Sequence, residues 1–293
     1  MSTGVLKLEG RSGGTRAKGW LFSFFLLASL TVGFIALVTL LVDVFKDGIG
    51  QIDRTLITGA PNVIEPATAG AGPAILATIY LMLLLLFMAV PIGVATSIYL
   101  EEYADKTRWY NRLLDLNIQN LAAVPSIVYG ILGLAFIVRG PVGIGRVLLA
   151  GAMILTLLVL PTVIIASREA IRAIPDSIRQ GGLALGATQW QVIWRQVLPA
   201  AVPGIATGTI LALSRAIGET APLLLVGALS YISFNPTLLG DFTALPIQIY
   251  QWISQDEAGF TLRAAGGIIV LLAILLTMNA FAILIRNRYQ KRW

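Results

Sequence analysis

Long charge-free apolar runs alternate with short charged segments along the 293 residues of the chain. The shortest of six such runs has 19 residues and the longest has 28: 20–42, 73–100, 116–138, 147–167, 196–214 and 264–285. A helix needs about 20 residues to cross a hydrocarbon core of about 30 Å, and it satisfies its own backbone hydrogen bonds there. The pattern therefore predicts an all-α polytopic membrane protein with six transmembrane helices.

A seventh apolar run, at residues 220–240, is interrupted by Pro222 and Pro236. Its dense apolar stretch is shorter than a span and has the length of a re-entrant or buried segment. We therefore expect residues 218–263 to form an external loop that folds back toward the membrane. Within this loop, residues 245–253 are expected to form an interfacial helix.

Lys and Arg residues are unevenly distributed over the segments between the six runs. With the N-terminus inside, the inner segments contain 15 of the 21 Lys and Arg residues and the outer segments contain 6. Positive residues in short loops favour the cytoplasm, so six spans with both termini cytoplasmic are expected. The chain then divides into an N-terminal tail at 1–19, a six-helix transmembrane domain at 20–286 and a C-terminal tail at 287–293. The first run exceeds the apolar region of a signal peptide and should remain as an anchor.

Composition excludes several kinds of chemistry. The chain is 57% hydrophobic and 12% charged, and it has no Cys and no His. Thiolate nucleophiles, imidazole bases and the usual zinc and haem ligands are therefore absent, and we expect no metal site and no catalytic residue. No Gly-Lys dipeptide occurs, so the phosphate-binding loop G-x-x-x-x-G-K-[ST] is missing. Any energy from ATP must come from a partner.

The net charge of +6 does not indicate nucleic-acid binding, since the arginines flank apolar runs, where basic residues set membrane orientation. The chain is therefore expected to contact membrane lipid and no nucleic acid. An enzyme acting inside the membrane would need a convergent set of acids or hydroxyls, and this class is the least supported.

The segment at 167–195, between the fourth and fifth runs, carries two short helical patterns on the expected cytoplasmic side. Pro175 opens the first pattern, and Gly186 is a plausible stop in the left-handed conformation. Thr188 and Gln191 then match a capping box at the start of the second. The segment is expected to form two helices joined at a glycine corner. Its residues alone leave two alternatives: a plain connection, or a device that transmits movement.

Arg215 and Glu219 lie near the outer end of the fifth run. If the helix continues to Pro222, the two side chains share one face. A charge at membrane depth costs about 2.5–3.5 kcal/mol, so such residues normally face a partner or a water-filled path. A mutual ion pair that holds the helix near the interface is the alternative interpretation.

Two stretches resemble known importer motifs. The segment GLALGATQW followed by VLPAAVPG is similar to the EAA loop of ABC importer permeases, E-A-A-x3-G-x9-I-x-L-P. Gly186, Leu198 and Pro199 occupy the matching positions. The family often has Glu, Ala, Ala and Ile where this sequence has Gln180, Gly181, Gly182 and Gln196. The phrases RAIGETAP at 215–222 and LAAVPSIVYG at 121–130 are similar to those of phosphate-specific importers of the PstA type.

The resemblance implies a type I ABC importer permease fold in the bacterial inner membrane, forming half of a pathway for inorganic phosphate. It implies these substrate-pathway residues: Arg215, Glu219 and Ser126. It implies these ATPase-coupling residues: Leu183, Ala184, Leu185, Gly186, Ala187 and Thr188.

The implied partners are a PstC-type permease, two PstB-type ATPase subunits that bind ATP and Mg, and an external PstS-type phosphate-binding protein. The chain itself is expected to be neither an enzyme nor a cofactor carrier. Two alternatives remain: a permease for another oxyanion or small solute, and a secondary transporter or channel without an ATPase. The absence of a convincing internal repeat counts against a secondary transporter.

Overall fold

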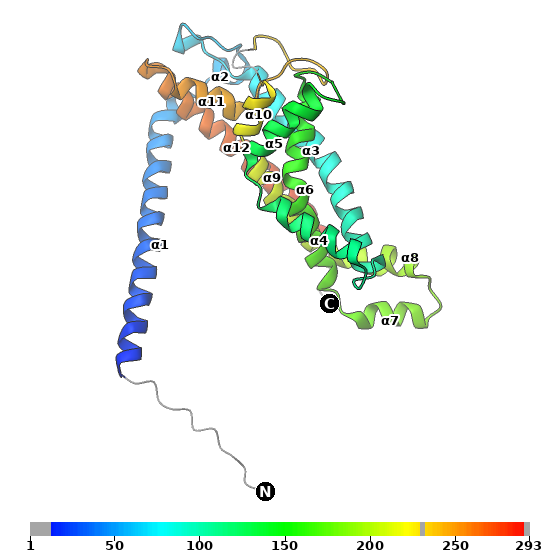
Figure 1. Cartoon of the computed structure of the whole chain (residues 1–293). Helices are drawn as coiled ribbons and strands as arrows, with labels where there is room; N and C mark the ends of the chain where they lie inside the picture. Colours follow the sequence, from blue (N-terminus) through cyan, green and yellow to red (C-terminus); the bar gives the residue numbers. More distant parts are fainter. Residues whose placement is uncertain (1–12, 229–231, 290–293) are drawn as a thin grey trace.

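The computed structural model describes residues 13–228 and 232–289, in which all regular structure is helical (Figure 1). The longer helices are α1 (Gly13–Gly48), α3 (Gly72–Ile98), α4 (Trp109–Ala122), α6 (Leu148–Arg172), α9 (Leu198–Ala216) and α12 (Ala258–Tyr289). The shorter α-helices are α2 (Arg54–Thr58), α5 (Ser126–Gly133), α7 (Asp176–Ala184), α8 (Gln189–Val192), α10 (Ala221–Val226) and α11 (Leu245–Ile253). Single 3-10 or π turns complete the set: η1 (Ile49–Gln51), η2 (Pro66–Thr68), η3 (Tyr99–Tyr103), η4 (Leu134–Val138) and η5 (Ile193–Val197).

Five continuous helices in the described residues are long and apolar enough to cross a membrane: Lys18–Gln51, Gly72–Tyr103, Leu148–Arg172, Gln189–Ala216 and Ala258–Arg288. A bent pair, Trp109–Ala122 with Ser126–Val138, makes a sixth if it is counted as one broken span. The predicted all-helical, polytopic fold is therefore confirmed. Parts of the two predicted tails, residues 1–12 and 290–293, lie outside the described residues, as do residues 229–231 of the predicted external loop.

The third predicted span is broken into two helices, α4 and α5. The chain turns by 105° between α4 and α5. Pro125 lacks a backbone N–H and disfavours helical geometry in the residue before it, so the helix breaks there. Across the turn, the hydroxyl of Tyr129 donates to the carbonyl of Leu121 at 2.8 Å. This hydrogen bond fixes the angle between the two halves.

Helix α6 lies at the centre of the bundle, where it packs against α3 and α9. Gly204 and Gly208 on α9 face Ala170 and Ala166 on α6, and a Cβ added at Gly208 would overlap the side chain of Ala166. Because neither glycine has a side chain, the two backbones approach closely, as small residues allow in bilayers. The α6–α9 contact therefore depends on glycine at these positions.

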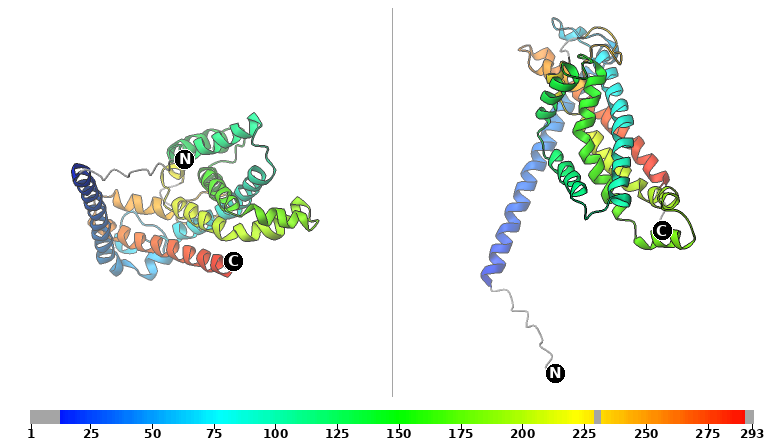
Figure 2. Two further views of the ribbon diagram at one scale, coloured as in Figure 1. Left: turned by 90° about the horizontal axis from the view of Figure 1, so that it is seen from below. Right: turned by 45° about the vertical axis from the view of Figure 1, so that its right-hand side comes forward.

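Helix α1 stands apart from the bundle along most of its length (Figures 1 and 2). It contacts α12 and η1 near its end, where Gly48 abuts the backbone of Ala265. Elsewhere its Phe, Leu and Val side chains are exposed. In a membrane, such a surface is covered by lipid or by another chain.

A buried arginine joins the start of α12 to the loop around α2. Arg263, with 3% of its side chain exposed, donates to the carbonyls of Pro66 at 2.8 Å and Gln51 at 2.9 Å. Its guanidinium also donates to both carboxylate oxygens of Asp53, each at 3.1 Å, and to the carbonyl of Ala67. All of its nitrogens therefore have partners, which indicates a structural role.

The predicted helix at residues 245–253 is confirmed as α11. One face of the helix is buried, with Trp252 against α12, whereas Tyr250 and Ile253 on it are exposed. The helix begins where the N–H of Leu245 donates to the hydroxyl of Thr78 on α3 at 2.8 Å. Helix α11 is therefore attached to the bundle at its first turn.

Candidate functional site: an exposed elbow and an arginine at opposite ends

Helices α7 and α8 and the short connection between them form a unit that we call the elbow (residues 176–192). The connection has the predicted glycine corner. Gly186 has a φ of +83°, a backbone conformation that residues other than glycine rarely adopt. The N–H of Ala187 donates to the carbonyl of Gly182 at 3.2 Å, and the N–H of Gly186 donates to that of Leu183 at 2.9 Å. This pair of bonds is the Schellman arrangement that closes a helix.

The predicted capping box at the start of α8 is also confirmed. The backbone N–H of Thr188 donates to Oε1 of Gln191 at 2.9 Å, and the N–H of Gln191 donates to the Thr188 hydroxyl at 3.4 Å. Helix α8 then continues through η5 into α9. The elbow is therefore continuous with the helix that carries Arg215.

The tip of the elbow is apolar and exposed. Leu185 is 89% exposed and Leu183 is half-exposed. Gly182 faces inward, because a Cβ added there would overlap the side chain of Val192 in α8. In Figure 1, α7 and α8 lie at one end of the molecule, beyond the helical bundle. An exposed apolar patch with charged neighbours is typical of a protein contact surface. We call this end of the molecule the elbow end.

A buried ion pair holds the elbow, and the sequence analysis did not single it out. Arg179 on α7 donates to Oε1 of Glu102 in η3, from Nε at 3.1 Å and from Nη2 at 2.8 Å. Only 7% of the Glu102 side chain is exposed. Gln189 on α8 donates to the backbone carbonyl of Glu102 as well. Both helices of the elbow are thus anchored to the end of α3.

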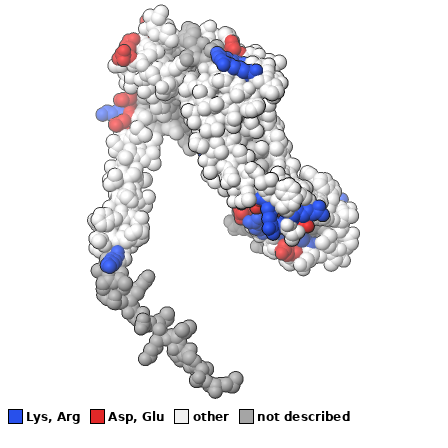
Figure 3. Space-filling model, in the orientation of Figure 1, with Lys and Arg blue, Asp and Glu red and all other residues white. Residues whose placement is uncertain are grey.

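A second ion-pair cluster lies beside the first. Glu101 accepts from Lys106 at 3.0 Å, from Arg168 at 2.9 Å and from Arg172 at 2.7 Å, and Arg168 also pairs with Asp115 of α4. Figure 3 shows acidic and basic side chains gathered at this end of the molecule. The sequence contained a signal for both clusters: two glutamates directly follow the second apolar run, and three arginines follow the fourth apolar run.

Arg215 and Glu219 form the expected ion pair at the opposite end of α9. Nε of Arg215 lies 3.3 Å from Oε1 of Glu219, with 52% and 16% of the two side chains exposed. The helix does not continue to Pro222, contrary to the condition stated above: it ends at Ala216, and the chain turns through Gly218. In the described part of the chain, neither Nη group of Arg215 has a hydrogen-bond partner.

The two motifs at 121–130 and 215–222 come together in space. Helix α5 packs on α10, and a Cβ added at Gly130 would lie 2.8 Å from the Cα of Pro222. Ser126 is half-buried in the first turn of α5. Within residues 13–228 and 232–289, its side chain forms no hydrogen bond to Arg215 or Glu219. The structure therefore joins the motifs, but within the described residues no hydrogen bond links Ser126 to the ion pair.

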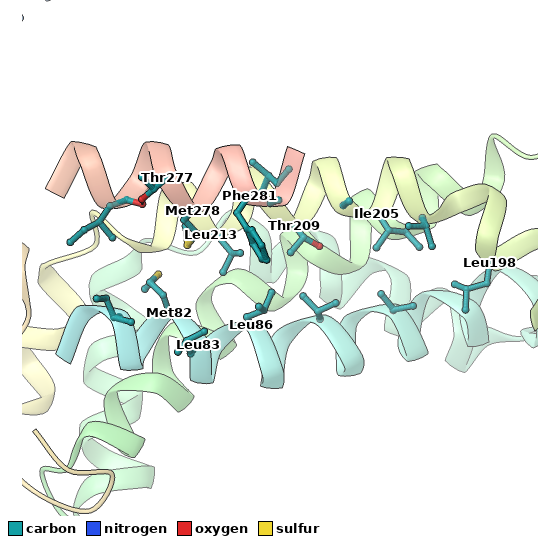
Figure 4. A pocket seen from close by; sticks show the side chains of 18 residues that line it. Met82, Leu83, Leu86, Leu198, Ile205, Thr209, Leu213, Thr277, Met278 and Phe281 are labelled. Carbon is teal, nitrogen blue, oxygen red and sulfur yellow. The ribbon is translucent and has the colours of Figure 1, made fainter. Parts of the chain in front are cut away.

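A cavity of about 760 Å³ lies between α3, α9 and α12 (Figure 4). Its lining is apolar except for Thr209 and Thr277, so the cavity by itself does not suit an anion. Leu213 lines it, and Arg215 follows two residues later on the same helix. The neighbouring Ser214 donates to Oδ1 of Asn279 on α12 at 3.0 Å. This hydrogen bond links α9 to α12 beside the cavity.

Comparison with known proteins was made on sequence and on structure. A family model described as "Binding-protein-dependent transport system inner membrane component" matches residues 89–293. The chain is 32% identical to phosphate transport system permease protein PstA 1 of Mycobacterium tuberculosis, over 92% of this chain and 89% of that protein. It is 30% identical to phosphate transport system permease protein PstA of Yersinia pestis, over 87% and 85% of the two chains.

Solved structures support the same fold. A chain of a bacterial alginate ABC transporter aligns with a TM-score of 0.66 at 18% identity, covering 93% of this chain and 96% of that one. A chain of the MetNI methionine ABC transporter aligns with a TM-score of 0.53 at 20% identity, covering 73% and 92%. The chain therefore belongs to the family of binding-protein-dependent transport system inner membrane components and, within it, to the PstA-type permeases.

Proposed function

We propose that this chain is the permease subunit of an ATP-driven importer of inorganic phosphate and forms half of the translocation pathway. The observation that carries the proposal is the half-exposed guanidinium of Arg215, which uses only Nε for Glu219. A planar guanidinium with free Nη groups can bind two oxygens of a phosphate in a bidentate manner. The PstA relatives are named for phosphate transport.

In the proposed mechanism, Glu219 and the anion compete for Arg215. When no anion is present, the Glu219 carboxylate neutralises Arg215 and limits the cost of a desolvated, unpaired cation. An arriving phosphate takes the Nη groups, and the Glu219 contact weakens. Ser126, half-buried on the neighbouring helix α5, is proposed to line the path farther along, where its hydroxyl can donate to the anion.

As a member of its family, the chain is a multi-pass inner membrane protein and a permease subunit, so ATP hydrolysis takes place in a separate subunit and not in this chain. We propose that the elbow contacts the ATPase through these residues: Leu183, Ala184, Leu185, Gly186, Ala187 and Thr188. Movement of the ATPase would then tilt α9 through α8, giving access from alternate sides by rigid-body motion. We propose that the elbow and both chain termini lie in the cytoplasm.

The family implies an ATPase and a binding protein as partners. We propose more specifically a PstC-type permease as the second half of the pathway, two PstB-type ATPase subunits and an external PstS-type phosphate-binding protein. We also propose the division into tails at 1–19 and 287–293, a permease domain at 20–286, a cytoplasmic coupling loop at 167–195 and an external re-entrant loop at 218–263.

Phosphate uptake by the assembled transporter tests the role of Arg215. We expect Arg215→Ala to lower uptake at least about tenfold, because a charge-assisted hydrogen bond contributes about 1.5–3 kcal/mol. Arg215→Lys keeps the positive charge but loses the planar guanidinium that can donate two parallel hydrogen bonds, so it should give an intermediate rate of phosphate uptake. Arg139→Ala is the matched control, since Arg139 is exposed and forms no ion pair in the described residues. Wild-type uptake by both Arg215 variants would remove this residue from the mechanism.

Anion-stimulated ATP hydrolysis distinguishes the remaining alternatives. A transporter for phosphate should respond to phosphate, and stimulation by another oxyanion instead would reassign the substrate. A secondary transporter or channel would move solute through the purified chain without an ATPase, and this result would contradict the proposal.

A further inference from the structure

A second, smaller cavity lies at the elbow end, between η3, α4 and α6. Its volume is about 130 Å³, several times the roughly 30 Å³ that one water occupies in the liquid. The cavity is lined by Leu100, Ala104, Lys106, Asn111, Arg112, Asp115, Arg168 and Arg172. It is separate from the Arg215 pathway and from the tip of the elbow, and neither of the roles proposed above uses it.

The charges around this cavity leave a positive excess. Four cations line it, and three carboxylates bond to those cations: Glu101, Asp115 and Glu169. The remaining cation is Arg112, whose Nε donates to the carbonyl of Lys106 at 3.3 Å. In the part of the chain that the structure describes, Arg112 has no carboxylate partner and its Nη groups have no hydrogen-bond acceptor. The cavity can therefore accept one anionic group.

Asn111 adds a requirement for a hydrogen-bond donor. Its side chain lines the cavity and is 6% exposed, and its Oδ1 is buried without a partner. The orientation of the amide is fixed, because Nδ2 donates to the carbonyl of Asp105 at 2.9 Å. A buried acceptor without a partner costs about 1–3 kcal/mol. An occupant with a hydroxyl beside its anionic group would satisfy Oδ1 as well as Arg112.

The surroundings of the cavity match the headgroup region of a bilayer. Trp109 and Tyr110 are exposed at the start of α4, and Leu113 and Leu114 are exposed one turn farther along. Tryptophan and tyrosine concentrate at headgroup level, with apolar side chains in the adjoining hydrocarbon. Basic pockets between helices on the inner side of a membrane are known to hold anionic headgroups.

We propose that this cavity is a binding site for a phosphate group that also carries a hydroxyl. The phosphate oxygens bind Arg112 and Lys106, and the hydroxyl donates to Oδ1 of Asn111. Two sources have this chemistry: the headgroup of phosphatidylglycerol, and protonated inorganic phosphate on the same side of the membrane. The site does not depend on the transport role, since it rests on other residues. Its occupant would touch Arg168 and Arg172, which lead into the elbow, so occupancy can influence coupling.

The test uses the transporter assembled without its external binding protein, purified in detergent and stripped of lipid. Native mass spectrometry measures retained phosphatidylglycerol, with phosphatidylcholine as the lipid that lacks a hydroxyl in its headgroup. Equilibrium binding of radiolabelled phosphate, with sulfate as competitor, measures the second source. Arg112→Ala is the test variant. Arg108→Ala is its matched control, because Arg108 is the N-cap of the same helix but pairs with Asp105. Both side chains are exposed, so both variants should fold.

We expect Arg112→Ala to bind one of the two probes about tenfold more weakly than the wild type, while Arg108→Ala binds both normally. Loss of phosphatidylglycerol alone identifies the lipid, and loss of one phosphate per chain identifies the free anion. Arg112→Lys should recover part of the affinity. Unchanged binding of both probes by Arg112→Ala would overturn the proposal. Equal retention of phosphatidylcholine, or equal competition by sulfate, would contradict the role given to Asn111.

Discussion

Arg179 donates two hydrogen bonds to the carboxylate of Glu102, and it thereby links the first helix of the elbow to the end of α3. The same guanidinium donates to the carbonyls of Ile174 and Ile171, at the end of α6. One side chain therefore joins three elements. A partner that displaces α7 would move α3 and α6 together, in addition to the direct connection from α8 to α9.

The Glu102–Arg179 pair should contribute to both stability and coupling. We expect Glu102→Gln to lower the free energy of unfolding by about 1–3 kcal/mol, because the partly buried guanidinium of Arg179 loses its charged acceptor. The ratio of phosphate transported to ATP hydrolysed should also fall. Thermal unfolding and paired flux and ATPase assays measure the two effects.

Asp176→Asn is the control for this pair. Asp176 also contacts Arg179, at 3.2 Å, but 85% of its side chain is exposed. Exposed ion pairs contribute about 0–1 kcal/mol, so this variant should remain close to the wild type. A loss of stability and coupling in Asp176→Asn as large as that in Glu102→Gln would contradict the idea that the buried carboxylate of Glu102 is the important partner of Arg179.

Gly186 should be replaceable only at a cost to the elbow. No atom lies within 4 Å of the Cβ position, so space is not the obstacle, but a φ of +83° costs a non-glycine residue about 1–2 kcal/mol. We expect Gly186→Leu to weaken association with the ATPase, measured by co-purification. Gly181→Leu adds the same side chain within α7, also in open space but without a positive φ, and should leave association intact. Equal co-purification of both variants would refute the role of the corner.

The α6–α9 contact should not tolerate a larger residue at Gly208. Overpacking of a tight interior typically costs about 1–3 kcal/mol, and Gly208→Leu would force Ala166 apart from α9. We expect a lower unfolding temperature in detergent. Gly33→Leu is the matched control, because Gly33 also lies in a membrane helix but has no atom within 4 Å of its Cβ position. A lower temperature for Gly33→Leu but not for Gly208→Leu would contradict the packing argument.

Acid should weaken the contact between Arg263 and Asp53. Hydrogen bonds from Arg263, and then from the backbone N–H of Leu56, hold the pKa of Asp53 below its ordinary value. A depressed carboxyl pKa stabilises the fold above the unfolded value of about 3.9, and this contribution is lost as pH falls through the folded pKa. Asp53→Asn should therefore be less stable than wild type at pH 7, and the difference should shrink as pH falls below about 4 and vanish only below the folded pKa.

Unfolding temperatures at several pH values measure this difference. Asp256→Asn is the comparison variant, since Asp256 is exposed and has no ion pair within the described residues. It should parallel the wild type at every pH. A difference between Asp53→Asn and wild type that persists undiminished at low pH would contradict the assignment.

Local chemistry determined much of this protein. Charge-free runs of span length have to become helices in lipid, because no other arrangement of a single segment satisfies its backbone there. The capping box at Thr188 and the stop at Gly186 are also local, since each depends on residues within a few positions. Such features could be predicted from the chain alone, and so could the charge pair at Arg215 and Glu219.

Contacts between distant segments could not be predicted in this way. The sequence placed Glu102 just after the second run and Arg179 well beyond the fourth. Only the packing of α3 beside α6, with α7 following α6, brought them together. Pro125 indicated in the sequence where the helix could break. The 105° angle of the break depends on the hydrogen bond from Tyr129 to Leu121 and on the packing of α10 against Gly130. The cavity beside Asn111 likewise exists only because three elements converge. Periodicity and caps record short-range preferences, whereas the partner of a buried charge is set by the tertiary packing that excludes water from it.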